Sequence, residues 1–411
     1  MNNTEWYKLD NMGVYYASTK DKKNPTVFRF TATMKDEVDV TNLRVALEDT
    51  MEVYPNFNVT LKKGLFWFYL EEEHHLPDIK EENKAVCARV YKSEYDILYR
   101  VSYYGKRINF EVSHILSDGR GTIEVFKTLI ANYVKYQYKV KNIKLNNGTI
   151  EEHTEDSFDK YYEKYKKDKY KEGKIYKYKN KKLPFEDAKF IELHLDCKKI
   201  LNKAHEYKAS LTAYLVAILI QSILKEMKQL DKGKYIKIDL PVDLRSYFRS
   251  ESSRNFFGLT YLSYKFTGEV DSIEDIIKVI NEEMTEKINK ENISKRMNKM
   301  VYFQKNFAIR AIPIFIKDIF LKTVNEFTSN TNTTTLSNVG KISFSKEVDE
   351  YVETTAAMTS PENNFKITIS TFKNDLVICI SDKYRRNNIV KNYVRALIDE
   401  DKDAYIISNG V

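Results

Sequence analysis

The sequence RINFEVSHILSDGRGTIEVF, residues 107–126, contains the most informative pattern in the chain. Polar and apolar residues alternate through its first part, as in a strand, and this strand leads directly into His114. Asp118 and Gly119 follow, and apolar residues then recur at helical spacing over 121–138. A histidine between a strand and a helix, four residues before an aspartate, predicts a reactive imidazole held in a turn. The alternative is an ordinary loop histidine, with Asp118 as a helix cap.

Outward from this stretch, the first half of the chain alternates strand and helix patterns. Residues 97–104 form a second strand pattern, joined to the first by a turn at Gly105. A helix is predicted over 40–54, with Thr41 as a plausible cap near its start and Pro55 at its end. Further strands are predicted at 27–34 and 65–70.

The composition changes over residues 139–183, which are dominated by Lys, Tyr, Glu and Asn. The run KYYEKYKKDKYKEGKIYKYKNKK, residues 160–182, is typical of a solvated connection. We therefore place a boundary between two lobes here. The N-terminal lobe is predicted to span residues 1–183, including the charged connection, and the C-terminal lobe residues 184–411.

The second half of the chain again mixes strand and helix patterns. Strands are predicted at 190–195, 235–240, 256–266, 341–344, 365–372 and 376–382. Helices are predicted at 211–227 with Ser210 as its cap, at 273–293, at 301–327 with a break at Pro313, and at 389–399. Because both halves combine helices and strands, the predicted fold class is α/β or α+β.

Charge and composition exclude several classes of function. The chain has 411 residues, of which 42% are hydrophobic and 31% charged, and its net charge is +8. Basic residues are interleaved with acidic ones, which favours an ordinary Lys-rich surface over nucleic-acid binding. The sequence EEEHH, residues 71–75, is interpreted as a solvated turn, because adjacent histidines point in different directions. We expect no metal site, and no phosphate-binding glycine loop is present.

The cysteines, the N-terminal pattern and the length of the apolar stretches predict where the protein is located. Cys87, Cys197 and Cys379 are scattered and odd in number, which favours a reducing compartment over a disulfide framework. The N-terminus lacks a secretory pattern, and no apolar stretch reaches 18 residues. The expected location is cytoplasmic, without stable membrane insertion. The segment 310–324 is amphipathic enough to touch lipid, but a helix between the lobes is the simpler interpretation.

Several ordered motifs resemble one known family. His114–Gly119 is similar to the HxxxDG motif of CoA-dependent acyltransferases, which include chloramphenicol acetyltransferase, plant BAHD enzymes, condensation domains and bacterial alcohol acetyltransferases. The segment VTNLRVALEDTMEVYPNFNVTLKKGLFWFYL, residues 40–70, also looks like the start of the alcohol acetyltransferase-like group. Further similarities are PVDLR at 241–245, NFFG at 255–258 and LSNVG at 336–340. The resemblance covers nearly the whole chain.

This resemblance implies a two-lobe chloramphenicol acetyltransferase-like fold, with an active-site tunnel between the lobes. Acyl-CoA is then the co-substrate, entering from one face, and a small-molecule or lipid acceptor enters from the other. No permanently bound cofactor is implied. A complete two-lobe chain forms its site alone, so we expect a monomer.

The resemblance also implies roles for individual residues. His114 takes the proton of the attacking hydroxyl or amine, and Asp118 pairs with Arg245 to hold the turn in shape. Gly119 allows a tight turn and a close approach of the helix. Ser337 and Asn338 are candidate donors to the oxyanion, although Asn338 and Gly340 are equally explained by a simple turn. Asn255 is a further candidate, whose alternative role is to shape the entrance of a strand.

Two departures from the family pattern leave alternatives open. Ser113 stands where condensation domains usually have a second histidine, which disfavours peptide-bond formation on carrier proteins. The DFGWG motif of the plant enzymes is absent. The alternatives are a carrier-protein-dependent condensation or lipid-acylating enzyme, and a non-catalytic binding relative. A nucleic-acid binder is a distant third.

Overall fold

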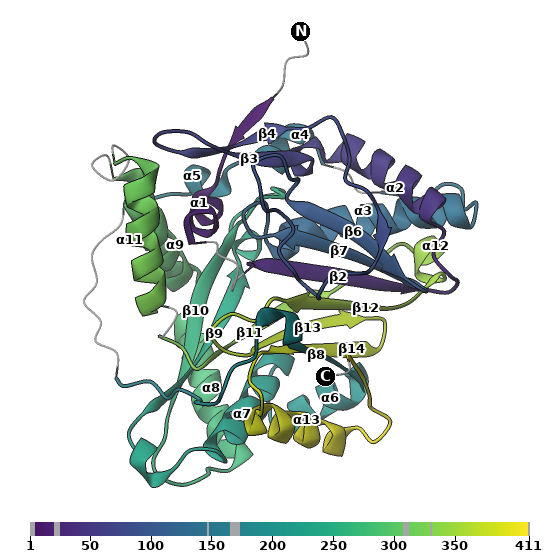
Figure 1. Cartoon of the computed structure of the whole chain (residues 1–411). Coiled ribbons are helices and arrows are strands. Elements are labelled where there is room, and N and C mark those ends of the chain that lie inside the picture. Colours follow the sequence, from purple (N-terminus) through teal and green to yellow (C-terminus); the bar gives the residue numbers. More distant parts are fainter. Residues whose placement is uncertain are drawn as a thin grey trace.

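The structure is a computed structural model that describes residues 5–19, 25–145, 148–164, 173–306, 312–328 and 331–409. Its elements form two lobes of mixed α/β character, which confirms the predicted fold class (Figure 1). The described strands form a seven-stranded, a five-stranded and a three-stranded sheet.

The first lobe is built on the five-stranded sheet, in the order β12-β2-β7-β6-β5. These strands are β12 (Val352–Thr359), β2 (Val27–Met34), β7 (Arg107–Ser113), β6 (Tyr99–Tyr104) and β5 (Lys80–Glu81). Helices α2 (Val40–Val53) and α3 (Gly119–Gln137) pack against each other beside it. A small sheet β1-β4-β3 lies above, formed by β1 (Trp6–Lys8), β4 (Phe68–Glu72) and β3 (Val59–Lys63) (Figure 1).

The alternation in β2 explains the two faces of this sheet. Phe28 and Phe30 are buried in the apolar core, and each contributes roughly 2 to 3 kcal/mol by leaving water. Arg29 points to the other face, where it pairs with the fully buried Glu111 at 2.8 Å. A buried charge requires such a partner. Helix α2 begins at Asp39, whose carboxylate accepts from the Asn42 amide, so the predicted cap at Thr41 was wrong.

The second lobe is built on the seven-stranded sheet, in the order β10-β9-β11-β13-β14-β8-β15. These strands are β10 (Phe257–Lys265), β9 (Tyr235–Asp243), β11 (Thr334–Lys341), β13 (Lys366–Phe372), β14 (Asp375–Asp382), β8 (Lys189–Asp196) and β15 (Tyr405–Ser408). Helices α6 (Cys197–Glu206), α7 (Leu211–Leu224), α8 (Ile273–Lys287) and α13 (Asn388–Glu400) cover one face (Figure 1). Helix α7 is buried along most of its length, and Ser210 caps it, as the sequence predicted.

Two predictions in the second half were wrong. The helix expected over 273–293 is two helices, α8 and α9 (Lys290–Lys305), because Asn289 ends one and caps the next. The strand expected at 341–344 lies earlier, as β11, and reaches only to Lys341. Helix α11 (Ile314–Thr328) begins after Pro313, while residues 307–311 of the predicted helix lie outside the described residues.

Several elements were not predicted. They include α1 (Asn11–Thr19), β12 and β15, together with the short helices α4 (Ile150–Thr154), α5 (Ser157–Lys160) and α12 (Lys346–Asp349). Strand β12 comes from the second half of the chain but pairs antiparallel with β2, so the chain crosses from one lobe to the other and back. The boundary near residue 183 stays a prediction.

The length and hydropathy of the helices were compared with those of membrane spans. Among the described residues, no single helix is long and apolar enough to cross a bilayer. Helices α6 and α7 meet that criterion only as a pair, bent by 80°.

Candidate active site

The histidine turn lies where β7 meets α3. The His114 amide donates to the Thr26 carbonyl at 2.9 Å, which extends the pairing of β7 with β2 to the turn itself. The Leu116 amide donates back to the Ser113 carbonyl at 2.9 Å and closes the turn. Asp118 then caps α3. Regular hydrogen bonds therefore fix the backbone of the histidine from both sides.

The His114 ring lies between aromatic side chains. Tyr16 of α1 stacks on it with ring centroids 4.9 Å apart, and Phe28 of β2 lies at 4.5 Å. Phe257, at the start of β10, lies at 6.4 Å. Burial, together with the positive charge of Lys366, lowers the pKa of His114 to about 4. The imidazole is therefore neutral at physiological pH and can accept a proton.

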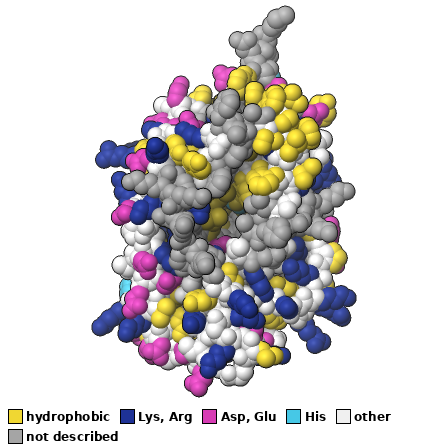
Figure 2. Space-filling model, turned by 90° about the vertical axis from the view of Figure 1, so that its left-hand side faces the viewer, with side chains coloured by type: hydrophobic (Ala, Val, Ile, Leu, Met, Phe, Trp, Pro, Cys, Tyr) yellow, Lys and Arg dark blue, Asp and Glu magenta, His cyan; other side chains and the backbone are white. Residues whose placement is uncertain are grey.

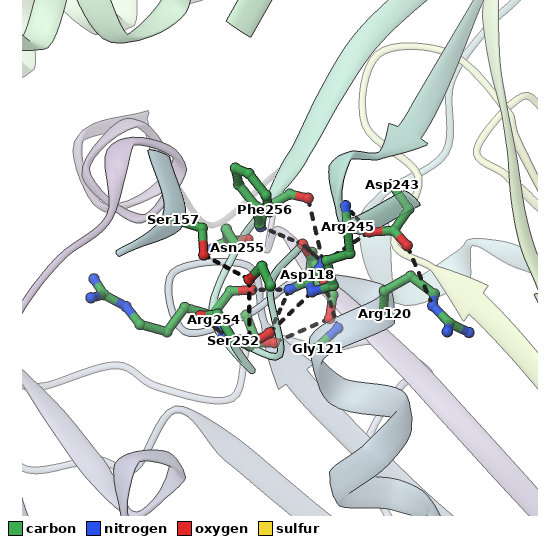
Figure 3. A network of polar contacts seen from close by, with 12 residues as sticks. Asp118, Arg120, Gly121, Ser157, Asp243, Arg245, Ser252, Arg254, Asn255 and Phe256 are labelled. Carbon is green, nitrogen blue, oxygen red and sulfur yellow. Dashed lines mark hydrogen bonds and ion pairs between the residues drawn. The ribbon is translucent and has the colours of Figure 1, made fainter. Parts of the chain in front are cut away.

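Asp118 is buried, and its carboxylate lies within a polar network (Figure 3). Its Oδ1 accepts from the Gly121 amide at 2.7 Å, as a helix cap does. Its Oδ2 accepts from the Phe256 amide at 2.6 Å and from Nη1 of Arg245 at 3.0 Å. The carboxylate thus joins the start of α3 to the segment that precedes β10.

Arg245 completes this network from the end of β9. Its Nε and Nη2 donate to the Ser252 carbonyl at 3.0 and 2.8 Å, and Nη2 also donates to the Arg254 carbonyl at 2.6 Å. Burial opposes its charge, but the carboxylates of Asp118 and Asp243 outweigh this effect and raise the pKa of Arg245. Asp118 and Arg245, which the family resemblance paired, therefore form an ion pair. Arg245 also holds the loop that follows it through the backbone carbonyls of that loop.

Asn255 contacts the backbone of the histidine and is not among the residues that line the cavity. Its Nδ2 donates to the His114 carbonyl at 3.0 Å and to Oδ2 of Asp10 at 3.2 Å. Asp10 also caps α1 by accepting from the Gly13 amide at 2.7 Å. Burial raises the pKa of Asp10 to about 6, although the charge of Arg254 opposes this shift. Since both bonds use its amide nitrogen, Asn255 fits the alternative role of shaping the entrance of β10.

The close approach that only glycine permits is at Gly121, which corrects the expectation for Gly119. A side chain added at Gly119 meets only Val339 and Phe30, at 3.7 Å or more. A Cβ added at Gly121 lies 2.4 Å from the Ser253 carbonyl oxygen, which is too close for any residue but glycine. Ser117 Oγ donates to the same carbonyl at 2.6 Å. The close approach is therefore between α3 and the Ser253 loop.

Ser337 and Asn338 lie on β11, on the cavity wall contributed by the second lobe. Asn338 donates through Nδ2 to Thr212 at 2.9 Å and accepts from the Gly340 amide at 2.9 Å. Gly340 has a φ of +84°, and the register with β13 shifts between Asn338 and Gly340. The segment is thus a bulged strand rather than a free turn. Within the described residues, the Ser337 hydroxyl makes no hydrogen bond.

One cavity of about 1660 Å³ joins these residues across both lobes. His114, Asp118 and Gly119 line it from the first lobe, and Ser337 and Asn338 from the second. The face that carries α11 shows hydrophobic side chains gathered around a hollow (Figure 2). Among the described residues, no three histidine, cysteine or acidic side chains come together in a way that could hold a metal ion.

Sequence reasoning missed several cavity residues. Glu362 and Lys366 form an ion pair at 2.8 Å on the cavity wall, close enough to His114 for their charges to act on it. Tyr15 and Tyr16 come from α1, which has a weak amphipathic pattern. No local signal distinguishes these residues from ordinary surface or core positions. The pairing of β12 with β2 returns the chain beside His114 and brings Glu362 and Lys366 there, whereas Tyr16 is placed by its own stacking on the His114 ring.

Comparison with known proteins supports the fold. No family model and no curated protein matches the sequence. F. sporotrichioides TRI101, solved with coenzyme A and T-2, matches 98% of this chain and 99% of its own with 12% identity and a TM-score of 0.64. The TRI3 trichothecene 15-O-acetyltransferase from Fusarium sporotrichioides matches 97% of this chain and 95% of its own, with 10% identity and a TM-score of 0.63.

A third similar structure is the starter condensation domain of rhizomide synthetase RzmA. It covers 96% of this chain and 95% of its own, with 9% identity and a TM-score of 0.58. The matches extend over nearly the whole chain in each case. They confirm that this protein has the two-lobe fold shared by CoA-dependent acyltransferases and condensation domains.

Proposed function

We propose that this protein transfers an acyl group from acyl-CoA to the hydroxyl or amine of an acceptor, with His114 as general base. The acceptor oxygen or nitrogen attacks the thioester carbonyl carbon while His114 takes its proton. The tetrahedral intermediate then collapses, the carbon–sulfur bond breaks, and His114 returns the proton to the thiolate. The products are an ester or amide and free coenzyme A.

The observation that carries this proposal is a neutral imidazole on the wall of a large cavity between two lobes. His114 Nδ1 is buried, which leaves Nε2 as the nitrogen able to face an acceptor. Its aromatic neighbours hold the ring in place without a carboxylate relay. A thioester is already activated, so the demand on the protein is proton removal and water exclusion.

The oxyanion of the intermediate requires a hydrogen-bond donor. Ser337 is the better candidate of the two on β11, because its hydroxyl lines the cavity and makes no hydrogen bond to the described residues. The Asn338 side chain is engaged on both its nitrogen and its oxygen. Asp118 and Arg245 act by holding the turn, and the mechanism routes no proton through them.

Coenzyme A carries phosphates that require cationic groups near the cavity. Lys177 and Lys182 reach the backbone carbonyls of Asn332 and Asn363, two residues of the cavity wall. Burial lowers the pKa of Lys177 to about 8, so it stays protonated for the most part at neutral pH. These lysines fit a polyphosphate co-substrate. The solved TRI101 structure contains coenzyme A in the same fold.

The test is free-thiol release from acetyl-CoA and longer acyl-CoAs across a panel of alcohols and amines. Wild type should release thiol only when acceptor is present, and His114→Ala should lower the rate about a hundred- to ten-thousandfold. Asn338→Ala is the matched control on the cavity wall, with a small effect expected. Acceptor-dependent release that is unchanged in His114→Ala contradicts the proposal.

A second candidate is a transferase that takes its acyl group from a carrier protein. The likeness to a condensation domain over 96% of the chain favours it, since such a domain has a similar fold. Ser113 in place of a second histidine argues against it. Transfer from an acyl-carrier protein but not from free acyl-CoA would select this candidate. Absence of transfer from both donors would select a non-catalytic binding relative.

A further inference from the structure

The cavity opens to solvent through an unusually apolar entrance. Trp6, Phe66 and Trp67 contribute to it from the small sheet, and Ile316 and Phe320 from α11. Trp6, Trp67 and Phe320 are each about two-thirds exposed, at 67%, 64% and 66%. Large apolar side chains that gather in this way mark a ligand or partner surface. We call these five residues the entrance cluster.

Hydrogen bonds and an ion pair next to the entrance cluster hold it in place. The Ile314 amide donates to the Leu65 carbonyl at 3.0 Å, and Lys317 Nζ donates to the Phe66 carbonyl at 3.0 Å. Lys63 and Asp318 form an ion pair at 3.0 Å. The hairpin tip between β3 and β4 is thus fastened to the first turns of α11. The exposed aromatic side chains belong to a fixed surface rather than to a loose loop.

The apolar surface continues from the entrance to the histidine. Met12, Val14, Tyr15 and Tyr16 of α1 line the same cavity, and Tyr16 stacks on the His114 ring. Close to His114, Glu362 pairs with Lys366 on the cavity wall. Because that pair is internally neutral, it can solvate a polar group without requiring a charge on it.

We propose that the acceptor is amphipathic, with one hydroxyl or amine that reaches His114 and an apolar body that lies on the entrance cluster. This inference rests on the proposed function and names its substrate class. A small polar acceptor makes no use of five apolar side chains at the entrance. An apolar chain or ring system covers them and gains roughly 0.8 kcal/mol for each buried methylene, which is about fourfold in affinity.

The entrance cluster supplies its own reporter, because the chain has only two tryptophans and both belong to it. We would titrate hexanol, octanol and decanol, each below its solubility limit, into the full-length protein and follow tryptophan fluorescence. Dissociation constants should fall about fourfold for each added methylene, with a blue shift of the emission. Dissociation constants that do not change with chain length overturn the proposal.

Two variants on α11 distinguish binding at the entrance cluster from binding at the outer surface of the helix. Phe320→Asp places a charge in the entrance cluster and should weaken decanol binding about tenfold or more. Ile319→Asp is the matched control, because Ile319 is 67% exposed on the same helix but does not line the cavity. It should change binding by less than about twofold. Both sites are exposed, so the thermal midpoint should stay constant. Equal weakening by both variants indicates adsorption to an outer face, such as a lipid-facing one, and overturns the proposal.

This test is independent of catalysis. Chain-length-dependent binding without any thiol release leaves the inference standing as a binding property and removes the proposed chemistry. Thiol release with short polar acceptors only, together with dissociation constants that do not change with chain length, supports the proposed chemistry and overturns the amphipathic acceptor.

Discussion

Replacing Arg245 with lysine tests whether the Asp118 network works by geometry or by charge. Arg245 donates three hydrogen bonds to the carbonyls of Ser252 and Arg254, from its Nε and Nη2 atoms. It donates to Asp118 separately, from Nη1. A lysine keeps the positive charge near Asp118 but has a single ammonium in place of the planar fork. Most of the carbonyl contacts are then lost.

The magnitude follows from these contacts. Three hydrogen bonds to buried carbonyls at roughly 1 to 1.5 kcal/mol each predict a loss of about 3 to 4 kcal/mol for Arg245→Lys. Arg245→Ala also leaves the buried Asp118 carboxylate without its cation, and breaking such a pair costs about 3 to 5 kcal/mol. Lysine should therefore restore about half of the stability that alanine removes, because it keeps a cation beside Asp118 but loses the carbonyl contacts.

Urea denaturation followed by circular dichroism measures these differences as shifts of the midpoint. Arg120→Lys is the matched control, because Arg120 is 41% exposed and lies 3.7 Å from Asp243 at the edge of the same network. It should change stability by less than about 0.5 kcal/mol. If Arg245→Lys is as mild as this control, the network depends on charge alone and the reasoning is refuted.

Three further predictions concern packing and protonation. Gly121→Ala should lower stability by about 1 to 3 kcal/mol while Gly119→Ala changes it little, as measured by urea midpoints; equal effects contradict the assigned close contact. The rate of acyl transfer should be flat from about pH 6 to 8, because the pKa of His114 is lowered to about 4; an inflection near 6.5 contradicts this. Burial opposes the charge of His194, but the neighbouring carboxylates of Asp375 and Glu192 outweigh this effect and raise the pKa of His194 from 6.5 to about 9. Its stabilising contribution is complete below about pH 6.5 and gone above about pH 9, so the thermal midpoint should fall over this range in wild type and less in His194→Gln.

The histidine turn and most long elements could be predicted because their signals are local. The strand before His114, the cap at Asp118 and the apolar spacing of α3 are all contained in about thirty consecutive residues. The Asp118–Arg245 pair spans 127 residues and was accessible only through the family resemblance. Helix α7 was predictable from its apolar run and from Ser210.

The remaining features depend on tertiary pairing. Strand β12 is buried because it pairs with β2, and its own sequence, VETTAAMT, lacks a regular alternation of polar and apolar residues. The same pairing brings Glu362 and Lys366 to the cavity wall. The sequence leaves an oxyanion site and a simple turn as equal alternatives at Asn338, because Asn338 and Gly340 have turn propensity, which a β-bulge also uses. Residue composition alone does not distinguish a turn from a β-bulge.

The most direct test of the central claim is the product formed from acetyl-CoA and a long-chain alcohol. Mass spectrometry of the alcohol and a thiol assay on the same sample should show ester and free coenzyme A in equal amounts with wild type. His114→Gln should form neither while it still binds coenzyme A in calorimetry. An ester formed by His114→Gln at a rate within about tenfold of wild type contradicts the role of His114 as general base.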